Sequence, residues 1–207
     1  MIESEKNEYD FYSERANWSF EDIDYTSEVF TNWIYEDEIK KRVNENTKIL
    51  DLGTAAGEKV IKKFPNCAEI LGTDFSDKMI ETANKNLLQS GRKNISFRVM
   101  DNLKMDTPDN YFDLVTARHT IIDPLQILKT LKEGGQLIIR GVDKLDCWSL
   151  KRMFKRGQAY HDVKPISLID YETIIPLEKS GPFHSINYNS SYAIEIKEMG
   201  VYQITYF

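Results

Sequence analysis

The chain has 207 residues, of which 41% are hydrophobic and 29% are charged, and its formal net charge is −6. This length fits one globular domain, and the composition excludes collagen-like, low-complexity and wholly disordered chains. No apolar run reaches the roughly 20 residues that span a bilayer, and the first ten residues, MIESEKNEYD, are acidic where a secretory signal is basic. We therefore expect a cytoplasmic protein that does not enter a membrane.

The N-terminal segment carries most of the acidity. Residues 1–46 hold 13 acidic and 5 basic side chains, and nine of the 24 aromatic residues lie within the first 35. A disordered acidic tail lacks such aromatic residues. We expect residues 1–46 to form a helical cap on a domain of residues 47–207, with residues 28–43 the most clearly helical.

From Thr47 onward, short apolar runs alternate with segments of helical length, which is typical of βα units around a parallel sheet. The expected strands are 48–51, 69–73, 95–99, 112–117 and 136–141. The expected helices are 58–64, 76–89 and 124–131. Ser76 is a favourable N-cap, Gly91 a favourable helix end, and Gly134-Gly135 the expected exit from the third helix.

The last third of the chain has a different pattern. Residues 147–160 and 168–178 are predicted to be helical, and residues 185–207 form two β-rich runs broken at Met199-Gly200. The sequence thus predicts an α/β fold with a mostly parallel seven-stranded sheet flanked by helices and a C-terminal antiparallel hairpin.

The two cysteines, Cys67 and Cys147, lie far apart and have no nearby Cys/His cluster. This spacing excludes a disulfide framework and a zinc site. We expect two reduced, buried thiols and no bound metal.

Ligands of open α/β sheets bind beyond the carboxyl ends of the strands. The first such turn is Asp51-Leu52-Gly53-Thr54-Ala55-Ala56-Gly57, whose glycines let a ligand approach the backbone. The second strand leads to Asp74, a carboxylate that can accept both hydroxyls of a ribose, and the third leads to Asp101-Asn102, which suit an adenine edge. The ordered recurrence of these three signals predicts a nucleoside cofactor.

Two nucleoside cofactors compete for this pattern. A nicotinamide dinucleotide needs G-x-G-x-x-G, whereas this turn has Gly53-x-x-x-Gly57 followed by Glu58 and no adjacent cation. A diphosphate would therefore face the carboxylates of Asp51 and Glu58. S-adenosylmethionine carries an ammonium and a sulfonium and no phosphate, so the acidic turn favours it.

Five segments resemble, in order, the motifs of class I S-adenosylmethionine-dependent methyltransferases. They are ILDLGTAAGEKV (49–60), LGTDFSDKMIETA (71–83), ISFRVMDN (95–102), FDLVTARH (112–119) and LKEGGQLII (131–139). The resemblance covers residues 47–142. It implies a Rossmann-like fold and a methyltransferase that converts S-adenosylmethionine to S-adenosylhomocysteine.

The resemblance also implies roles for single residues. The turn from Asp51 to Gly57 would surround the methionine part, Asp74 would hold the ribose hydroxyls, and Ala117 would line the reaction chamber. The full set of implied cofactor residues is Asp51, Gly53, Thr54, Ala55, Gly57, Asp74, Phe75, Met79, Asp101, Asn102 and Ala117. Phe75 and Met79 would lie against the adenine. Ala55 departs from the family, which often has a third glycine there.

The segment after the fourth strand bears on catalysis. By resemblance, Arg118 and His119 would line the reaction chamber, where His119 could accept a proton and Arg118 could bind an anionic group of the acceptor. In the alternative, His119 is a structural loop residue and Arg118 pairs with Asp123. Methyl transfer relies strongly on proximity, so a catalytic base is not obligatory. His161 and His184 are expected to be structural or exposed.

The aromatic N-terminal segment resembles the lid of small-molecule members of the family. This nominates Tyr9, Tyr12 and Trp18 for the acceptor pocket, where ring faces could also hold the sulfonium. The alternative is that these rings are plain core packing.

A basic stretch, Lys151, Arg152, Lys155 and Arg156, raises the alternative of an RNA methyltransferase. The chain as a whole is acidic, and an Asn-Pro-Pro-Tyr-type tetrapeptide, the family's mark of amino-group methylation on bases or glutamine, is absent after the fourth strand. We expect methyl transfer to oxygen or nitrogen of a small molecule and no nucleic-acid partner. A non-catalytic S-adenosylmethionine-binding protein is the other alternative, and the acceptor's identity and the oligomeric state stay open.

Overall fold

The structure is a computed structural model that describes residues 34–141, 152–155, 186–188, 192–194 and 202–205. Several expectations lie outside these residues. They are the lid residues Tyr9, Tyr12 and Trp18, the thiol of Cys147, both C-terminal histidines, His161 and His184, and the helices expected at 168–178 and over most of 147–160.

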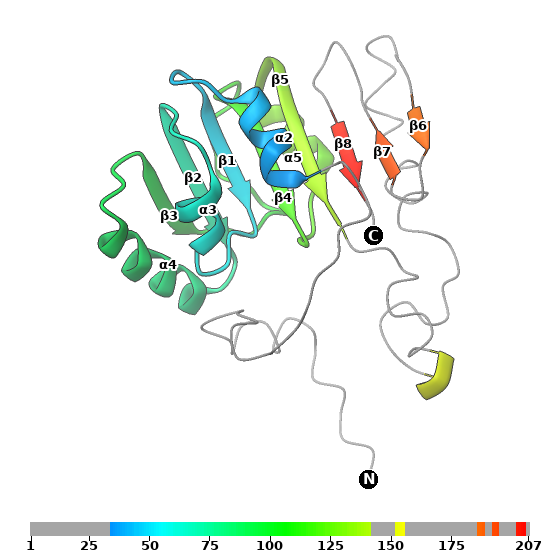
Figure 1. Ribbon diagram of the computed structural model, residues 1–207, viewed down its shortest axis with the longest axis horizontal. Coiled ribbons are helices and arrows are strands. Elements are labelled where there is room, and N and C mark those ends of the chain that lie inside the picture. The colour runs from blue at the N-terminus through cyan, green and yellow to red at the C-terminus, as the bar shows by residue number, and fades with distance from the viewer. Residues whose placement is uncertain (1–33, 142–151, 156–185, 189–191, 195–201, 206–207) are drawn as a thin grey trace.

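The main sheet of the described residues has six parallel strands in the order β3-β2-β1-β4-β5-β8 (Figure 1). Its strands are β1 (Lys48–Leu52), β2 (Glu69–Asp74), β3 (Ile95–Val99), β4 (Phe112–Arg118), β5 (Leu131–Arg140) and β8 (Tyr202–Thr205). The strand order reverses direction between β1 and β4, which places the expected ligand-binding point at their carboxyl ends. The predicted parallel α/β sheet is confirmed.

The predicted count of seven strands differs from the six found in the main sheet of the described part. Two further strands, β6 (Ile186–Tyr188) and β7 (Tyr192–Ile194), pair with each other antiparallel and form a separate small sheet. The break at Met199-Gly200 that defined the expected hairpin lies outside the described residues.

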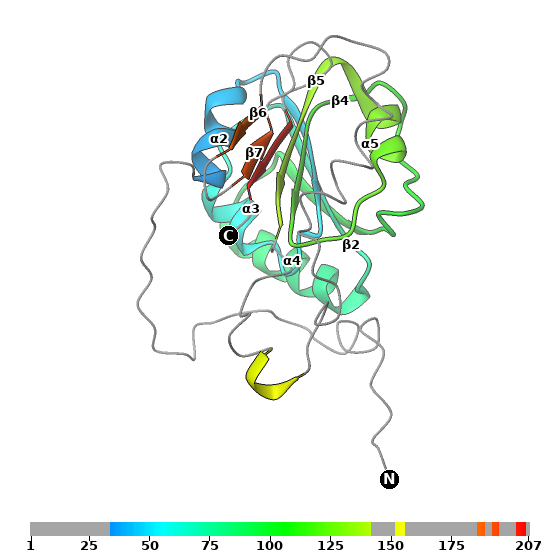
Figure 2. The same ribbon diagram turned by 90° about the vertical axis from the view of Figure 1, so that its right-hand side faces the viewer.

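Helices cover both faces of the sheet. Helices α2 (Tyr35–Arg42), α3 (Glu58–Lys63) and α4 (Asp77–Ser90) lie on one face, and α5 (Pro124–Thr130) lies on the other (Figure 2). The strands are therefore buried on both sides: Ile49 packs with the α2–α4 layer, and its neighbour Leu50 packs with the α5 layer. Burial on both faces explains why these strands are nearly continuous apolar runs rather than alternating ones.

Capping residues define the ends of α4 and α5, and the Ser76 cap and the Gly91 end are as the sequence predicts. The Ser76 hydroxyl accepts a hydrogen bond from the Met79 N–H at the start of α4, and Gly91 ends that helix with a φ of 70°. Asp123 caps α5 by accepting from the Leu125 N–H, and Pro124 occupies the first turn. These contacts satisfy donors and acceptors that a helix leaves unpaired at its ends.

One boundary is wrong in the sequence prediction. Strand β5 begins at Leu131, directly after α5, and not at residue 136. Leu131 pairs with Phe112 while Gln136 pairs with Leu114, so the extra residues between them form a bulge in β5. Gly134, with a φ of 72°, provides the left-handed conformation within that bulge. Gly134-Gly135 is thus part of the strand and not a helix-to-strand connection.

Three further expectations concern the described part of the chain. Cys67 is a buried free thiol, as predicted. Within the described ranges, no helix is both long and apolar enough to span a bilayer, and no group of three His, Cys, Asp or Glu side chains could hold a metal ion.

Candidate functional site

The turn after β1 is tied to the end of β2 by backbone hydrogen bonds. The Thr54 N–H donates to the Thr73 carbonyl at 2.8 Å, and the Ala55 N–H donates to Asp74 Oδ2 at 3.0 Å. Gly53 and Gly57 both have left-handed φ angles, of 70° and 76°. The predicted glycine turn and the predicted ribose acceptor therefore form one unit at the carboxyl ends of adjacent strands.

Close packing explains the two glycines of this turn. A Cβ on Gly53 would lie 2.6 Å from Cβ of Thr120, and a Cβ on Gly57 would lie 2.7 Å from the Phe97 ring. Ala55, between them, has a φ of 50°, which costs an L-amino acid about 1–2 kcal/mol. A glycine at this position, which the family often has, would adopt the same φ without this strain.

The Asp74 carboxylate is buried and accepts two backbone hydrogen bonds. Oδ1 accepts from the Ser76 N–H at 3.0 Å, and Oδ2 accepts from the Ala55 N–H. Burial raises the pKa of Asp74, and the backbone N–H donors oppose that rise. Because a carboxylate has about four acceptor positions, both oxygens can still accept from ribose hydroxyls. Phe75 next to it is 36% exposed, whereas Met79 is buried in α4.

Asn102 joins the loop after β3 to the loop after β4. Its Nδ2 donates to Thr120 Oγ1 at 2.9 Å and to the Ile121 carbonyl at 3.2 Å. Its Oδ1 is buried and has no hydrogen-bond partner within the described residues. A buried acceptor of this kind fits an amino donor such as that of adenine. Asp101 is exposed and accepts from the Leu103 N–H.

Asp51 is a buried carboxyl at the end of β1, and only 6% of it is exposed. The Thr116 hydroxyl donates to its Oδ1 at 2.7 Å. Burial raises the pKa of Asp51 to about 6, while the hydrogen bond from Thr116 and the charge of Arg118 hold it lower than burial alone would. Burial, and then the charge of Asp51, raise the pKa of the neighbouring Tyr35 phenol. A positively charged ligand beside Asp51 would favour its ionised form.

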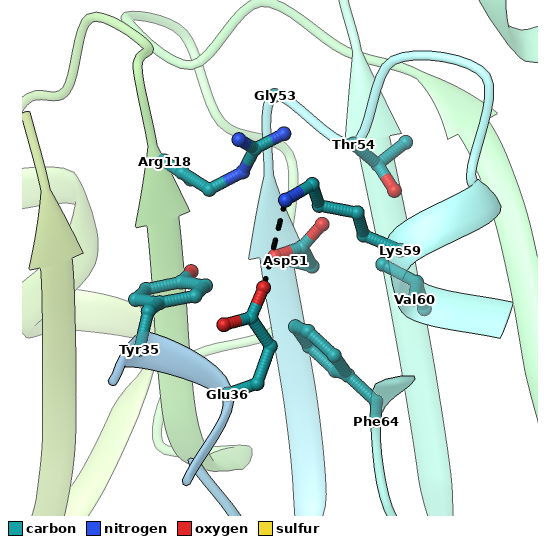
Figure 3. Close-up of a pocket in the computed structure, with 9 residues that line it drawn as sticks. All are labelled: Tyr35, Glu36, Asp51, Gly53, Thr54, Lys59, Val60, Phe64 and Arg118. Atoms are coloured by element: carbon teal, nitrogen blue, oxygen red, sulfur yellow. Dashed lines mark ion pairs between the residues drawn. The ribbon is translucent and has the colours of Figure 1, made fainter. Parts of the chain in front are cut away.

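A pocket lies between α2, α3 and the carboxyl ends of β1 and β4 (Figure 3). Its walls combine charged, polar and apolar side chains. They are Tyr35, Glu36, Asp51, Gly53, Thr54, Lys59, Val60, Phe64 and Arg118. Lys59 Nζ lies 3.5 Å from Glu36 Oε1, and in Figure 3 the Arg118 and Lys59 side chains extend toward each other above Asp51.

The pocket brings together some predicted residues and adds others. Asp51, Gly53, Thr54 and Arg118 were predicted from the strand ends. Tyr35, Glu36 and Lys59 were missed, because they come from helices and no strand-end signal marks them.

The three residues at the end of β4 differ in their exposure to solvent. Ala117 is buried, Arg118 is partly buried and lines the pocket, and His119 is exposed with a φ of 54°. The His119 N–H donates to the Arg140 carbonyl at 2.8 Å. Asp123 caps α5, and the structure shows no ion pair between Arg118 and Asp123 in the described part, so the expected pairing of these two side chains is wrong. The role of His119, as proton acceptor or structural loop residue, stays a prediction.

Comparisons with known proteins place this chain in a family. The model of the methyltransferase domain family matches residues 43–185. The chain is 30% identical over 171 residues to the release factor glutamine methyltransferase of Flavobacterium psychrophilum, covering 74% of this chain and 58% of the relative. It is 29% identical over 109 residues to a ubiquinone/menaquinone biosynthesis C-methyltransferase of Ectopseudomonas mendocina, covering 47% of this chain and 42% of the relative.

A solved structure gives the same result for the fold. It is that of a proposed S-adenosyl-L-methionine-dependent methyltransferase from Methanococcus maripaludis, with a TM-score of 0.54 and 23% identity over 76% of this chain and 80% of that chain. This chain spans less than two thirds of either curated relative. The family match over more than half of the chain, together with its fold, shows that the chain belongs to the class I S-adenosylmethionine-dependent methyltransferases.

Proposed function

We propose that this chain transfers the methyl group of S-adenosylmethionine to an oxygen or nitrogen of a small-molecule acceptor and releases S-adenosylhomocysteine. The observation that carries the proposal is the pocket, which adjoins the glycine turn at the carboxyl ends of β1 and β4. A polar pocket next to a nucleoside-binding edge lets an acceptor and a methyl donor meet in one site.

Four sets of groups would hold the cofactor. Asp74 would accept the ribose hydroxyls, Asn102 Oδ1 would accept from the adenine amino group, and Phe75 would lie beside the ring. Asp51 and the turn to Gly57 would face the methionine part, where the ionised carboxyl of Asp51 attracts a positive charge. When bound, S-adenosylmethionine supplies a methyl carbon activated by a positively charged sulfur.

The pocket walls support a polar acceptor. Four of the nine lining residues, Glu36, Asp51, Lys59 and Arg118, carry acidic or basic side chains, and such groups favour hydrogen-bonding ligands over apolar ones. An oxygen or nitrogen nucleophile loses a proton as it attacks the methyl carbon. His119, exposed one residue beyond Arg118, would accept that proton.

We also propose that the segment before residue 34 is a helical lid that includes Tyr9, Tyr12 and Trp18. Tyr35 and Glu36, the first two residues of α2, line the pocket, so a lid that precedes them would begin next to it. Deletion of residues 1–33 should speed dissociation of S-adenosylhomocysteine, measured by stopped-flow fluorescence. An unchanged dissociation rate would remove the lid from the proposal.

Titration calorimetry with S-adenosylmethionine, S-adenosylhomocysteine and NAD tests the cofactor assignment. We expect the first two to bind and NAD not to bind. A mass-spectrometric search for methylated products, in pools of small molecules, in protein and in RNA, then tests the acceptor class. Methylated protein or RNA in the absence of any methylated small molecule would contradict the proposal.

A further inference from the structure

Three cationic side chains converge at the end of β4. Arg118 and Lys59 both line the pocket, and Arg140 lies beside Arg118 because the two residues are register partners in β4 and β5. Burial and then the charge of Arg118 lower the pKa of Lys59. The same two causes, in the same order, lower the pKa of Arg140. The charge of Arg118 thus repels those of Lys59 and Arg140, because the three side chains are partly buried close to one another.

Two carboxylates of the described part lie nearby, and neither forms an ion pair with Arg118. Glu36 lies 3.5 Å from Lys59, and Asp51 accepts the Thr116 hydroxyl. Arg118 makes no ion pair and no side-chain hydrogen bond with any described residue. A guanidinium has five N–H donors in a planar fork that matches a carboxylate or phosphate. A partly buried Arg118 that faces the pocket therefore has its donors available for a ligand.

We propose that Arg118 and Lys59 form a binding site for an anionic group, a carboxylate or a phosphate, on the methyl acceptor. This inference rests on the proposed function and narrows its acceptor to an anionic small molecule. An anion between the two side chains would satisfy the guanidinium donors and offset the repulsion among Arg118, Lys59 and Arg140.

The cofactor's own carboxylate is the other source of such a group. Strand order favours the acceptor. The ribose acceptor Asp74 ends β2, the turn follows β1, and Arg118 ends β4, on the side of β1 away from β2. Arg118 also directly precedes His119, the proposed proton acceptor. The anion site thus lies on the catalytic side of the turn and away from the nucleoside side.

Inorganic phosphate is the probe for this site, titrated by calorimetry into the full-length protein saturated with S-adenosylhomocysteine. We expect phosphate to bind without displacing S-adenosylhomocysteine. Arg118→Gln should weaken phosphate binding by about tenfold or more and leave the affinity for S-adenosylhomocysteine within about twofold, since a charged hydrogen bond is lost only for the anion. Lys59→Gln is the second variant and should weaken phosphate binding in the same direction.

Arg98→Gln is the matched control, because Arg98 forms a surface ion pair with Asp106 at the β3 edge of the sheet. It should change neither affinity. Phosphate that binds wild type and Arg118→Gln equally, or fails to bind wild type, overturns the anion site. Phosphate that competes with S-adenosylhomocysteine, together with weaker S-adenosylhomocysteine binding by Arg118→Gln, assigns the site to the cofactor and overturns the acceptor assignment. Failure of wild type to bind S-adenosylhomocysteine would instead contradict the proposed function itself.

Discussion

The two sides of the site are built differently. On the β2 and β3 side, backbone groups hold the polar side chains: Asp74 accepts from two N–H groups, and Asn102 donates to the Ile121 carbonyl. On the β4 side, Arg118 and Lys59 extend from a strand end and a short helix into the pocket. The first side is preorganised by its own chain, whereas the second has charged groups available to a ligand.

In the proposed function, the β2 side binds the cofactor, which is always the same, and the β4 side binds the acceptor. A backbone-anchored carboxylate suits one fixed ligand, because its geometry is set before binding. Long cationic side chains can adjust to different acceptors. We therefore expect changes on the β2 side to alter cofactor affinity, and changes on the β4 side to alter turnover or acceptor binding.

His119→Asn tests the β4 side most strongly. Asparagine tolerates the left-handed backbone of position 119 but lacks an imidazole to accept a proton. Loss of a general base lowers turnover by about 10²–10⁴-fold, and we expect that fall with an unchanged affinity for S-adenosylhomocysteine. Steady-state kinetics on an identified acceptor, paired with calorimetry, measures both. Turnover equal to wild type would make His119 a structural loop residue.

Asp51 links the site to stability. Its folded-state pKa of about 6 lies above the ordinary value of 3.8, so the folded protein binds this proton more tightly than the unfolded chain does. This contribution to the free energy of unfolding therefore rises as pH falls from 7 to 4, by about 2 kcal/mol. Urea denaturation of wild type and Asp51→Asn at both pH values measures it. From pH 7 to pH 4, we expect the free energy of unfolding of wild type to rise by that amount relative to that of Asp51→Asn. An equal change in both proteins would contradict the raised pKa of Asp51.

Asp74→Asn tests the β2 side. The amide retains the shape of the carboxylate but loses the charge that strengthens hydrogen bonds to ribose hydroxyls. A hydrogen bond to a charged group contributes about 1.5–3 kcal/mol, so we expect at least tenfold weaker S-adenosylhomocysteine binding in calorimetry. Asp77→Asn, at the exposed first turn of α4, is the control and should bind as wild type does. Equal affinities for all three proteins would withdraw the ribose assignment.

Ala55→Gly gives the smallest expected effect. Glycine removes the cost of the left-handed φ of 50° but loses more conformational entropy on folding. The balance should raise the free energy of unfolding by about 0.5 kcal/mol. Ala56→Gly, the buried neighbour without a positive φ, should lower it by about 1 kcal/mol. Thermal denaturation that shows equal losses for both variants would exclude strain at Ala55.

The sequence was sufficient for features set by local chemistry. The first four strands begin where predicted, and the Ser76 cap and the Gly91 end are as expected, because periodicity and capping residues determine them. Two kinds of feature escaped prediction. The bulge in β5 depends on pairing with β4, and the helix residues Glu36 and Lys59 reach the pocket only through tertiary packing.

Arg92 does not line the pocket, but it supports the helix that carries one of the pocket's side chains. This guanidinium, just beyond the end of α4, donates to the carbonyls of Val60, Ile61, Phe64 and Pro65. Helix α3 has only six residues, too few to be stable alone, and it carries Lys59 into the pocket. The hydrogen bonds from the Arg92 side chain to these four carbonyls thus help to hold Lys59 in its position at the pocket. A substitution of Arg92, a half-buried residue that does not line the pocket, would therefore shift Lys59 and with it the proposed anion site.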